Sequence, residues 1–317
     1  MARRALESAA IVLAVAIVLV AAQNAAIGAF FPRLERLTTD FSPAYLRREL
    51  GRLAAEPGPI VFLGDSVVWG YHLAPQQTAV AVLSSRGCAC RNLAFKSGSP
   101  PNYYAVVRLL EAARARPKAV VLEINQKVFS EADPAYQKLH PAVADLAAPL
   151  LTPDDRAALA VAPAGGGLAA ALDRALEPLS LLYAMRSDVR ETLYGDAAEP
   201  AQPVTAEMFQ ASYDLTPLGP ENAGVHFLTK TLDALRARRI PCVAFLTPAN
   251  HALLHEYIDN AEYRENGAFL RRLLELHGAR VVDLDAAFPA REFIDNDHLT
   301  AAGQRRLASA LSPVLPR

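Results

Sequence analysis

The sequence has few cysteines and no excess of charge of either sign. Three cysteines among 317 residues are too few for a disulfide framework, and their spacing does not match that of a structural zinc site. The 32 basic and 33 acidic side chains leave a formal net charge of −1, which argues against a basic nucleic-acid-binding protein. Because hydrophobic residues make up 52% of the chain, intrinsic disorder is excluded as well. We therefore expect a folded protein with a sizeable core.

Charge is missing from one long segment near the amino terminus. No charged residue occurs between Glu7 and Arg33. Residues 9–31 are apolar except at Gln23 and Asn24. A helix of this length, at about 1.5 Å per residue, can cross a hydrocarbon core of about 30 Å. The segment predicts an amino-terminal transmembrane helix; a cleaved signal peptide and a buried core helix are the alternatives.

The flanking charges predict how such a helix is oriented. Arg3 and Arg4 precede the apolar segment, and no later segment is hydrophobic enough to cross again. By the positive-inside rule, the amino terminus lies in the cytoplasm. We therefore expect a membrane anchor over residues 1–32 and a folded domain over residues 33–317. That domain would face the periplasm or the cell exterior from a single-pass position in the inner membrane.

Behind this segment, short apolar runs alternate with helical patterns. Such runs, bounded by Pro and Gly, are typical of buried parallel strands. The predicted strands are 60–63, 90–95, 119–124, 240–246 and 280–284. Helical patterns cover 41–55 and 103–116, and further helices end near residues 239 and 278. This alternation predicts an α/β domain, a three-layer flavodoxin-like parallel sheet with helices on both faces.

The middle of the chain interrupts the alternation. Residues 131–222 are rich in Ala and Leu, and a helical period is clearest over residues 168–194. Loop signals lie at 163–167 and 195–203. We interpret residues 131–222 as a helical insertion over one end of the sheet.

The first candidate site residue follows the first strand. The apolar run 60–63 leads directly into Gly64-Asp65-Ser66. In a parallel α/β sheet, ligands bind at the carboxyl ends of the strands. A serine there, at the start of a helix, has backbone N–H groups and a partial positive charge beside it. Ser66 is therefore a candidate nucleophile, although an ordinary turn with Ser66 as a helix cap explains the same residues.

A base for this serine is available near the carboxyl terminus. Asp295 and His298 are three residues apart, so their side chains can meet on one face of a turn. The carboxylate would then fix the imidazole tautomer and stabilise its cation. Asp297 is a poorer partner because neighbours in sequence point apart. A surface turn before the last helix is the alternative interpretation.

The order of these segments resembles the SGNH, or GDSL-type, hydrolase superfamily of esterases and deacylases. Gly-Asp-Ser at 64–66 stands at that family's nucleophile block, and Asp295-x-x-His298 stands at its terminal block. Between them, residues 92–98 (Asn-Leu-Ala-Phe-Lys-Ser-Gly) resemble the second block and residues 123–126 (Glu-Ile-Asn-Gln) the third. The resemblance covers most of the chain after the anchor, apart from the insertion.

The resemblance implies a role for each matched residue. Asp295 would orient His298, which would remove the proton of Ser66 as it attacks an ester carbonyl. The resulting oxyanion would be received by the backbone N–H groups of Ser66 and Gly98 and by the side-chain amide of Asn125. Taken without the resemblance, Gly98 is a turn glycine and Asn125 the end of a buried strand.

The sequence departs from the family pattern at three positions. Val67 replaces the leucine after the serine, and Glu123 and Gln126 replace the Gly and Asp of the third block. Neither the motifs nor their spacing calls for a metal or other cofactor. His251 and His255 have the i, i+4 spacing of a zinc pair, but the glutamate and third ligand of a metalloprotease helix are missing.

The resemblance also implies a class of substrate. One amino-terminal helix, a divergent Gly-Asp-Ser domain and a helical insertion are similar to bacterial proteins that work with membrane-bound O-acyltransferases on cell-wall or exopolysaccharide acyl groups. We therefore expect an esterase or O-acyltransferase that forms an acyl-Ser66 intermediate. Its partners would be an acylated polysaccharide or small ester and a membrane-bound O-acyltransferase, not nucleic acid. The alternative is a non-catalytic carbohydrate-binding or scaffolding module on the same fold.

Two further features leave alternatives open. Tyr103 and Tyr104 could form a wall that stacks on sugar rings, although aromatic residues at the start of a helix are more often core. Cys88 and Cys90 could oxidise together, or either could bridge to Cys242. Buried free thiols are the favoured state.

Overall fold

The computed structural model describes most of the chain after residue 42. The described residues are 14–26, 43–56, 58–132, 136–159, 172, 175–176, 179–180, 183, 204–213 and 216–316. The chain divides into two compact units. The sheet and the candidate site belong to the larger unit, which comprises Leu46–Ala164 and Gln202–Arg317.

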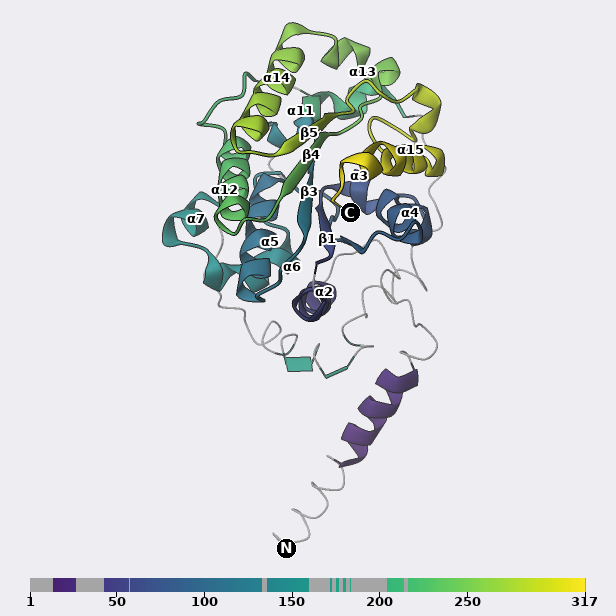
Figure 1. The fold of residues 1–317 in the computed structure, drawn as a ribbon, viewed down its shortest axis with the longest axis vertical. Helices are drawn as coiled ribbons and strands as arrows, with labels where there is room; N and C mark the ends of the chain where they lie inside the picture. Colours follow the sequence, from purple (N-terminus) through teal and green to yellow (C-terminus); the bar gives the residue numbers. More distant parts are fainter. Residues whose placement is uncertain are drawn as a thin grey trace, which may run out of the picture. The chain divides into compact units, whose positions relative to one another are not determined.

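The larger unit is built on a five-stranded parallel sheet (Figure 1). The strands are β1 (Ile60–Leu63), β2 (Cys90–Asn92), β3 (Ala119–Ile124), β4 (Cys242–Leu246) and β5 (Arg280–Asp283). Their spatial order, β2-β1-β3-β4-β5, is the flavodoxin-like order. The predicted α/β class and parallel sheet are therefore confirmed.

The central strands carry the apolar runs that predicted them. Every residue of β1 and β3 is buried, and β1 pairs in parallel with β2 on one side and β3 on the other. β2 ends earlier than predicted, at Asn92 instead of Phe95. There the Asn92 side chain accepts from the backbone N–H of Ala94 at 3.0 Å and donates to the carbonyl of Val68 at 3.0 Å. These bonds turn the chain toward the segment after β1.

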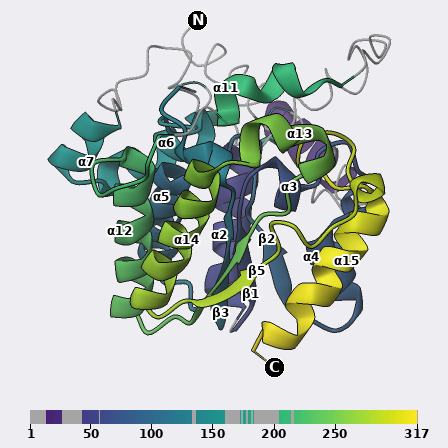
Figure 2. The same ribbon diagram turned by 90° about the horizontal axis from the view of Figure 1, so that it is seen from above.

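Helices cover both faces of the sheet, as Figure 2 shows. Helices α5, α12 and α14 lie on one side, where α5 packs against α12, and α4 and α15 pack together on the other side. The described helices are α2 (Pro43–Ala55), α3 (Ser66–Trp69), α4 (Ala79–Ser85), α5 (Pro100–Ala112), α6 (Pro141–Ala147), α7 (Pro153–Ala158), α11 (Gln210–Tyr213), α12 (Ala223–Ala237), α13 (His251–Ile258), α14 (Ala261–Leu276) and α15 (Ala301–Leu311). The predicted three layers are present.

The predicted insertion is described only in part. Helices α6, α7 and α11 fall within residues 131–222. Most of the stretch with the clearest helical period, 168–194, lies outside the described residues. The boundaries of the anchor, the domain and the insertion therefore stay predictions.

The apolar segment at the amino terminus is also described only in part. Residues 14–26 form a helix, whereas residues 9–13 and 27–31 of the predicted span lie outside the described residues. Among the described helices, none combines the length and the apolar character needed to cross a membrane.

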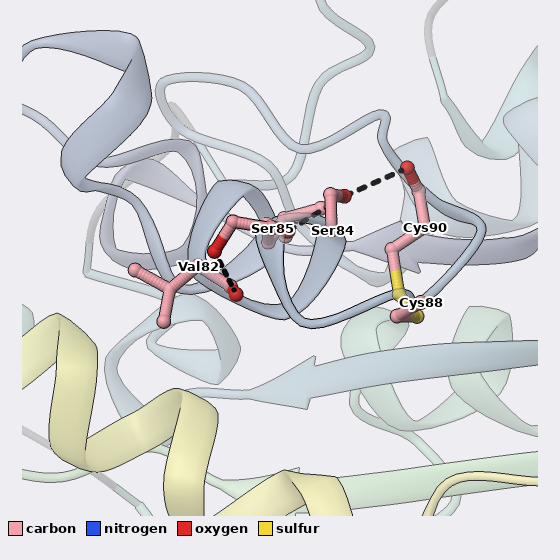
Figure 3. Close-up of a disulfide and its surroundings, with 6 residues drawn as sticks. Val82, Ser84, Ser85, Cys88 and Cys90 are labelled. Atoms are coloured by element: carbon pink, nitrogen blue, oxygen red, sulfur yellow. Dashed lines mark hydrogen bonds between the residues drawn. A yellow bond between two sulfur atoms is a disulfide. The ribbon is translucent and has the colours of Figure 1, made fainter.

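Two of the three cysteines are joined. Cys88 and Cys90 form a disulfide just before and at the start of β2, and the Ser84 hydroxyl donates to the Cys90 carbonyl at 3.5 Å (Figure 3). Cys242 is a free thiol, and burial raises its pKa to about 12. The expectation of three free thiols is therefore wrong for Cys88 and Cys90, whose separation of two residues already brings their Cα atoms to 5.3 Å.

Candidate active site

Ser66 lies at the carboxyl end of β1, in a tight turn. It is the first residue of α3, and the Asp65 side chain caps this helix by accepting from the backbone N–H of Val67 at 2.8 Å. The helix ends after four residues at Gly70, whose φ of 82° is left-handed. The serine therefore begins a single helical turn, and the helix dipole expected beside it is small because so few peptide units are aligned.

Glu123 supports this turn from below. Its Oε2 atom accepts from the backbone N–H of Asp65 at 2.8 Å and of Val68 at 3.3 Å. A Cβ atom on Gly64 would lie 2.3 Å from the same oxygen, so the turn needs glycine there. Burial, followed by the charge of Asp65, raises the pKa of Glu123 well above its ordinary value. This glutamate, which replaces the glycine of the third block, is thus a support whose surroundings favour the neutral form.

The segment after β2 packs against the same turn. A Cβ atom on Gly98 would lie 2.0 Å from the carbonyl oxygen of Gly64. Glycine is therefore required at position 98 by the close approach of two backbone segments. Ser97, just before it, has a left-handed φ of 57°.

His298 reaches Ser66 from the other end of the chain. Its Nε2 lies 2.8 Å from the Ser66 hydroxyl oxygen, and its Nδ1 lies 2.6 Å from Oδ2 of Asp295. The other carboxylate oxygen of Asp295 accepts from the backbone N–H of His298 at 2.9 Å. Serine, imidazole and carboxylate thus stand in the order that a nucleophilic serine requires. We call Ser66, His298 and Asp295 the triad.

One asparagine and one glutamine side chain hold the segments that carry the triad in this geometry. Asn250, just after β4, donates from its side chain to the carbonyl of Asp295 at 2.8 Å and from its backbone to the carbonyl of Asn296 at 2.8 Å. Gln304 of α15 donates to the carbonyl of Val67 at 2.7 Å. The segment that carries His298 is therefore tied both to the sheet and to the turn that carries Ser66.

The surroundings of the triad shift two of its pKa values. Burial disfavours the imidazolium of His298, but the hydrogen bond to Asp295 and the charges of Asp297 and Asp295 together outweigh it, so the pKa of His298 is raised above 6.5. Burial disfavours the Asp295 carboxylate too, yet its bonds to His298 leave its pKa below the ordinary value. His298 is therefore the stronger base for its contact with Asp295.

A second set of polar side chains is buried beside the triad. The side-chain amide of Asn125 donates to Oδ2 of Asp65 at 2.9 Å and to Oδ2 of Asp297 at 2.7 Å. The ammonium group of Lys127 contacts the same oxygen of Asp297 and lies 3.9 Å from Oδ2 of Asp65. All four residues are buried, as is Glu123. We call Asp65, Glu123, Asn125, Lys127 and Asp297 the charge cluster.

Asp297 differs from its expected position. The prediction that Asp295 is the better partner of His298 agrees with the distances, since Oδ1 of Asp297 is 3.7 Å from Nδ1. Asp297 does not point away into solvent, however. It is fully buried, and its Oδ1 atom has no hydrogen-bond partner among the described residues. The loop folds back tightly enough to bring both carboxylates beside one imidazole.

Two of the implied oxyanion donors are engaged elsewhere. The backbone N–H of Gly98 donates to the carbonyl of Phe95 at 3.0 Å. Both hydrogens of the Asn125 amide are used by the carboxylates of Asp65 and Asp297. For either group to receive an oxyanion as predicted, it would first have to give up these bonds. The N–H of Ser66, at the first position of α3, has no partner within its own helix.

A polar pocket of about 260 Å³ opens above Ser66. It is lined by Asp65, Ser66, Tyr71, Lys96, Ser97, Lys127, Tyr136, Phe209, Ser212, Asn296 and His298. Tyr71 packs 4.9 Å from the His298 ring, and the Lys96 ammonium lies 4.9 Å from the centre of the Tyr71 ring. Tyr103 and Tyr104, by contrast, are buried in the core. The aromatic residues of the pocket are therefore not the ones that the sequence suggested.

A metal is poorly accommodated among these residues. Atoms of Asp295, Asp297 and His298 lie within 4.8 Å of one another. Both ring nitrogens of His298 are already hydrogen-bonded, one to Asp295 and one to Ser66. His251, the other candidate ligand, bonds to Asp285 at 2.9 Å instead of pairing with His255.

Several residues of the site were not found from the sequence. Lys127, Asn250 and Gln304 lie in no motif, and their roles depend on contacts between distant segments. Asn296, which lines the pocket, occupies a variable position of the Asp295-x-x-His298 block. The one available signal was Glu123, a charged residue inside an otherwise apolar strand. A charge at that position needs a buried partner.

Comparisons with known proteins do not establish a family for this chain. A family profile matches residues 221–316, which is less than half of the chain. A search of curated proteins finds no match. One similar solved structure is a proposed lipolytic protein of the G-D-S-L family from Desulfitobacterium hafniense DCB-2, with 12% identity and a TM-score of 0.42 over 81% of this chain and 99% of that chain. A second is a member of the lipolytic G-D-S-L family from Veillonella parvula DSM 2008, with 11% identity and a TM-score of 0.42 over 82% of this chain and 98% of that chain. A third is a GDSL-like lipase from Bacteroides thetaiotaomicron VPI-5482, with 9% identity and a TM-score of 0.40 over 86% of this chain and 98% of that chain. At these TM-scores and identities, the activities of those proteins do not carry over to this chain, whose function must be argued from its own site.

Proposed function

We propose that this protein is a serine esterase or O-acyltransferase that works through an acyl-Ser66 intermediate. The observation that carries the proposal is the pair of contacts at His298, 2.8 Å to the Ser66 hydroxyl and 2.6 Å to the Asp295 carboxylate. A capping serine in an ordinary turn needs neither contact. A raised pKa makes His298 a stronger proton acceptor, as a general base requires.

The chemistry follows from these contacts. His298 takes the hydroxyl proton as the Ser66 oxygen bonds to the carbonyl carbon of an ester, which places a negative charge on the carbonyl oxygen. When this intermediate collapses, the bond to the alcohol oxygen breaks and His298 returns the proton to that oxygen. The acyl group is then held on Ser66. Attack by water releases a carboxylic acid, whereas attack by a sugar hydroxyl gives a new ester.

The substrate class is part of the proposal. The pocket walls offer hydroxyl, amide and ammonium groups together with the rings of Tyr71 and Tyr136, a combination that suits a sugar carrying a small acyl group. We propose acylated polysaccharide of the cell envelope or an exported polymer as the substrate.

The location belongs to the same proposal. The uncharged segment 9–31 supports an anchor over residues 1–32, with the catalytic domain on the periplasmic side of the inner membrane. A membrane-bound O-acyltransferase would then be the partner that supplies or receives acyl groups. Protease protection of the domain in intact cells, lost when the outer membrane is opened, tests this location.

The activity is tested with the purified full-length protein in detergent. A fluorophosphonate should label one serine, which peptide mass spectrometry should identify as Ser66, and p-nitrophenyl acetate should be hydrolysed. Ser66→Ala should abolish both reactions. Ser212→Ala is the matched control, since Ser212 lines the same pocket without contacting His298. Labelling and turnover that survive Ser66→Ala would reject the proposal.

Hydrolysis and transfer are separated by adding an acceptor. If the acyl enzyme transfers its group, a soluble oligosaccharide should accelerate p-nitrophenol release, and the sugar should gain the mass of the acyl group. If water is the only acceptor, the sugar should leave the rate unchanged. Binding of the polymer by a protein without any turnover would instead favour the non-catalytic module.

A further inference from the structure

We infer that Lys127 is a catalytic residue of the proposed reaction, whose ammonium group stabilises the oxyanion formed on the substrate. The inference rests on the proposed function, because the oxyanion arises only when Ser66 attacks an ester. It assigns to Lys127 the role for which the sequence suggested Asn125. No motif in the chain marks this lysine.

The location of the ammonium group carries the first part of the argument. Lys127 is the second residue of a short 3₁₀ helix, Gln126–Phe129, which follows β3 and Asn125 directly. Its side chain is 7% exposed, and it lines the pocket together with Ser66 and His298. Asn125 and Gly98 do not line that pocket. The lysine therefore belongs to the wall of the cavity that an ester bound at Ser66 would enter.

The charges around the pocket carry the second part. Asp65 lines the pocket and Asp297 lies directly behind it, and a negative oxygen formed beside two carboxylates would be repelled by both. A cation within the same group of side chains offsets this repulsion. Lys127 contacts Asp297 and faces Asp65, and an ammonium group has three hydrogens to share among them and a substrate oxygen.

The state of the lysine agrees with this role. Burial disfavours its charge, but Asp297 and, to a smaller extent, Tyr136, Asp65 and Tyr213 together outweigh that effect, and the pKa of Lys127 is raised well above its ordinary value. Lys127 is thus a fixed cation and not a proton acceptor. The single turn of α3 contributes little dipole at Ser66, so the ammonium group of Lys127 supplies positive charge that the helix does not. Lys96, the other cationic residue of the pocket lining, holds its ammonium group 4.9 Å from the centre of the Tyr71 ring.

The test compares variants in which Asp297 is already neutral. Removing Lys127 alone would leave the buried Asp297 unpaired and could unfold the protein. Asp297→Asn keeps the ammonium group, and Lys127→Met in the Asp297→Asn background removes it without leaving Asp297 as a buried unpaired charge. Asp65 keeps its hydrogen bonds from Val67 and Asn125 in both variants. The structural control is Lys230→Met with Asp155→Asn, which removes a second, partly buried Lys–Asp contact whose residues do not line the pocket.

The measurements are p-nitrophenyl acetate turnover, inhibition by phenylboronic acid and urea unfolding of the full-length protein. Phenylboronic acid forms a tetrahedral anion on an active serine and so mimics the oxyanion. Compared with Asp297→Asn, the double variant should lose about 100-fold in kcat and in boronate affinity, with KM changed much less, as expected when one oxyanion donor is removed. The Lys230/Asp155 control should keep its kcat.

The outcomes separate the two proposals. Equal kcat in Asp297→Asn and the double variant would overturn the role of Lys127 while the Ser66 reaction stands. A loss of kcat that merely follows a loss of folded protein in urea would overturn it as well. Absence of any Ser66-dependent turnover in the parent protein would overturn both the role of Lys127 and the proposed function.

Discussion

The triad and the charge cluster lie side by side but are built in different ways. In the triad, two of the three side chains are three residues apart, and each partner makes one direct contact in a defined direction. In the charge cluster, five buried side chains come from the turn after β1, from β3 and the residues that follow it, and from the loop before α15. Two of them, Asn125 and Lys127, share one carboxylate oxygen of Asp297. The triad is suited to moving one proton, whereas the cluster fixes charge around it. The comparison predicts different responses to mutation.

Loss of a triad member should have the largest effect. Ser66→Ala and His298→Ala should each lower kcat on p-nitrophenyl acetate by about 10⁶-fold, because the serine and the imidazole act as one unit. The double variant should be no slower than either single variant. A double variant far slower than both would show that the two side chains contribute separately and would break the distinction drawn here.

The two carboxylates beside His298 should differ next. Asp295→Asn should lower kcat by about 10⁴-fold, since an amide cannot hold the imidazole in the required tautomer. Asp297→Asn should cost far less, because Oδ1 of Asp297 is 3.7 Å from Nδ1 and makes no hydrogen bond to it. Steady-state kinetics of the two variants decides the question. Equal losses would mean that Asp297 belongs to the triad.

Within the charge cluster, Glu123 should affect stability more than chemistry. Glu123→Gln should keep the free energy of unfolding within about 1 kcal/mol, because the raised pKa of Glu123 favours the neutral form and its amide analogue can still accept from Asp65 and Val68. Glu123→Ala should cost about 3 kcal/mol by leaving those two buried N–H groups unpaired. Urea unfolding measures both. A large loss in the glutamine variant would mean that the glutamate is ionised.

A smaller effect should separate positioning from capping. Asn250 and Asn260 both cap helices, α13 and α14, but only Asn250 also donates to the Asp295 carbonyl. Each alanine variant should lose about 1 kcal/mol of stability through the lost cap. Only Asn250→Ala should also lower kcat, by about 10-fold, through a displaced triad. Similar kcat values in the two variants would show that this contact does not position the triad.

The smallest predicted effect is on the pH profile. His298 must be neutral to accept a proton, and its pKa is raised, so kcat/KM should increase with pH through a midpoint above 6.5. Asp295→Asn removes the hydrogen bond that raises this pKa, so the midpoint of the residual activity should move down. A midpoint that is unchanged in this variant would assign the shift to the charge cluster.

The triad and the charge cluster also differ in how far the sequence predicted them. The strands β1 and β3 could be placed to the residue because β1 is an apolar run between Pro59 and Gly64, and β3 is a mostly apolar run between the polar residues Lys118 and Asn125. Ser66, Asp295 and His298 could be named because each stands in a short motif. Lys127 and Asn250 could not be named, since their roles depend on which distant segments meet.

The engagement of Asn125 was unpredictable for a related reason. A side-chain amide at the end of a strand can donate to a substrate or to a protein carboxylate with equal ease. Which it does depends on Asp65 and Asp297, the latter 172 positions away along the chain. Local spacing carries no information about such a choice.

The bonds of Gln304 join segments that are very far apart along the chain. This side chain accepts from Ala79 and donates to Val67, which lie 225 and 237 positions away, and the contact between His298 and Ser66 spans 232 positions. Contacts with such wide loops are slow to form because closing the loop costs entropy before the contact stabilises anything. We therefore expect the imidazole to reach the hydroxyl at position 66 late in folding, so a partly folded molecule would present this serine without its proton acceptor.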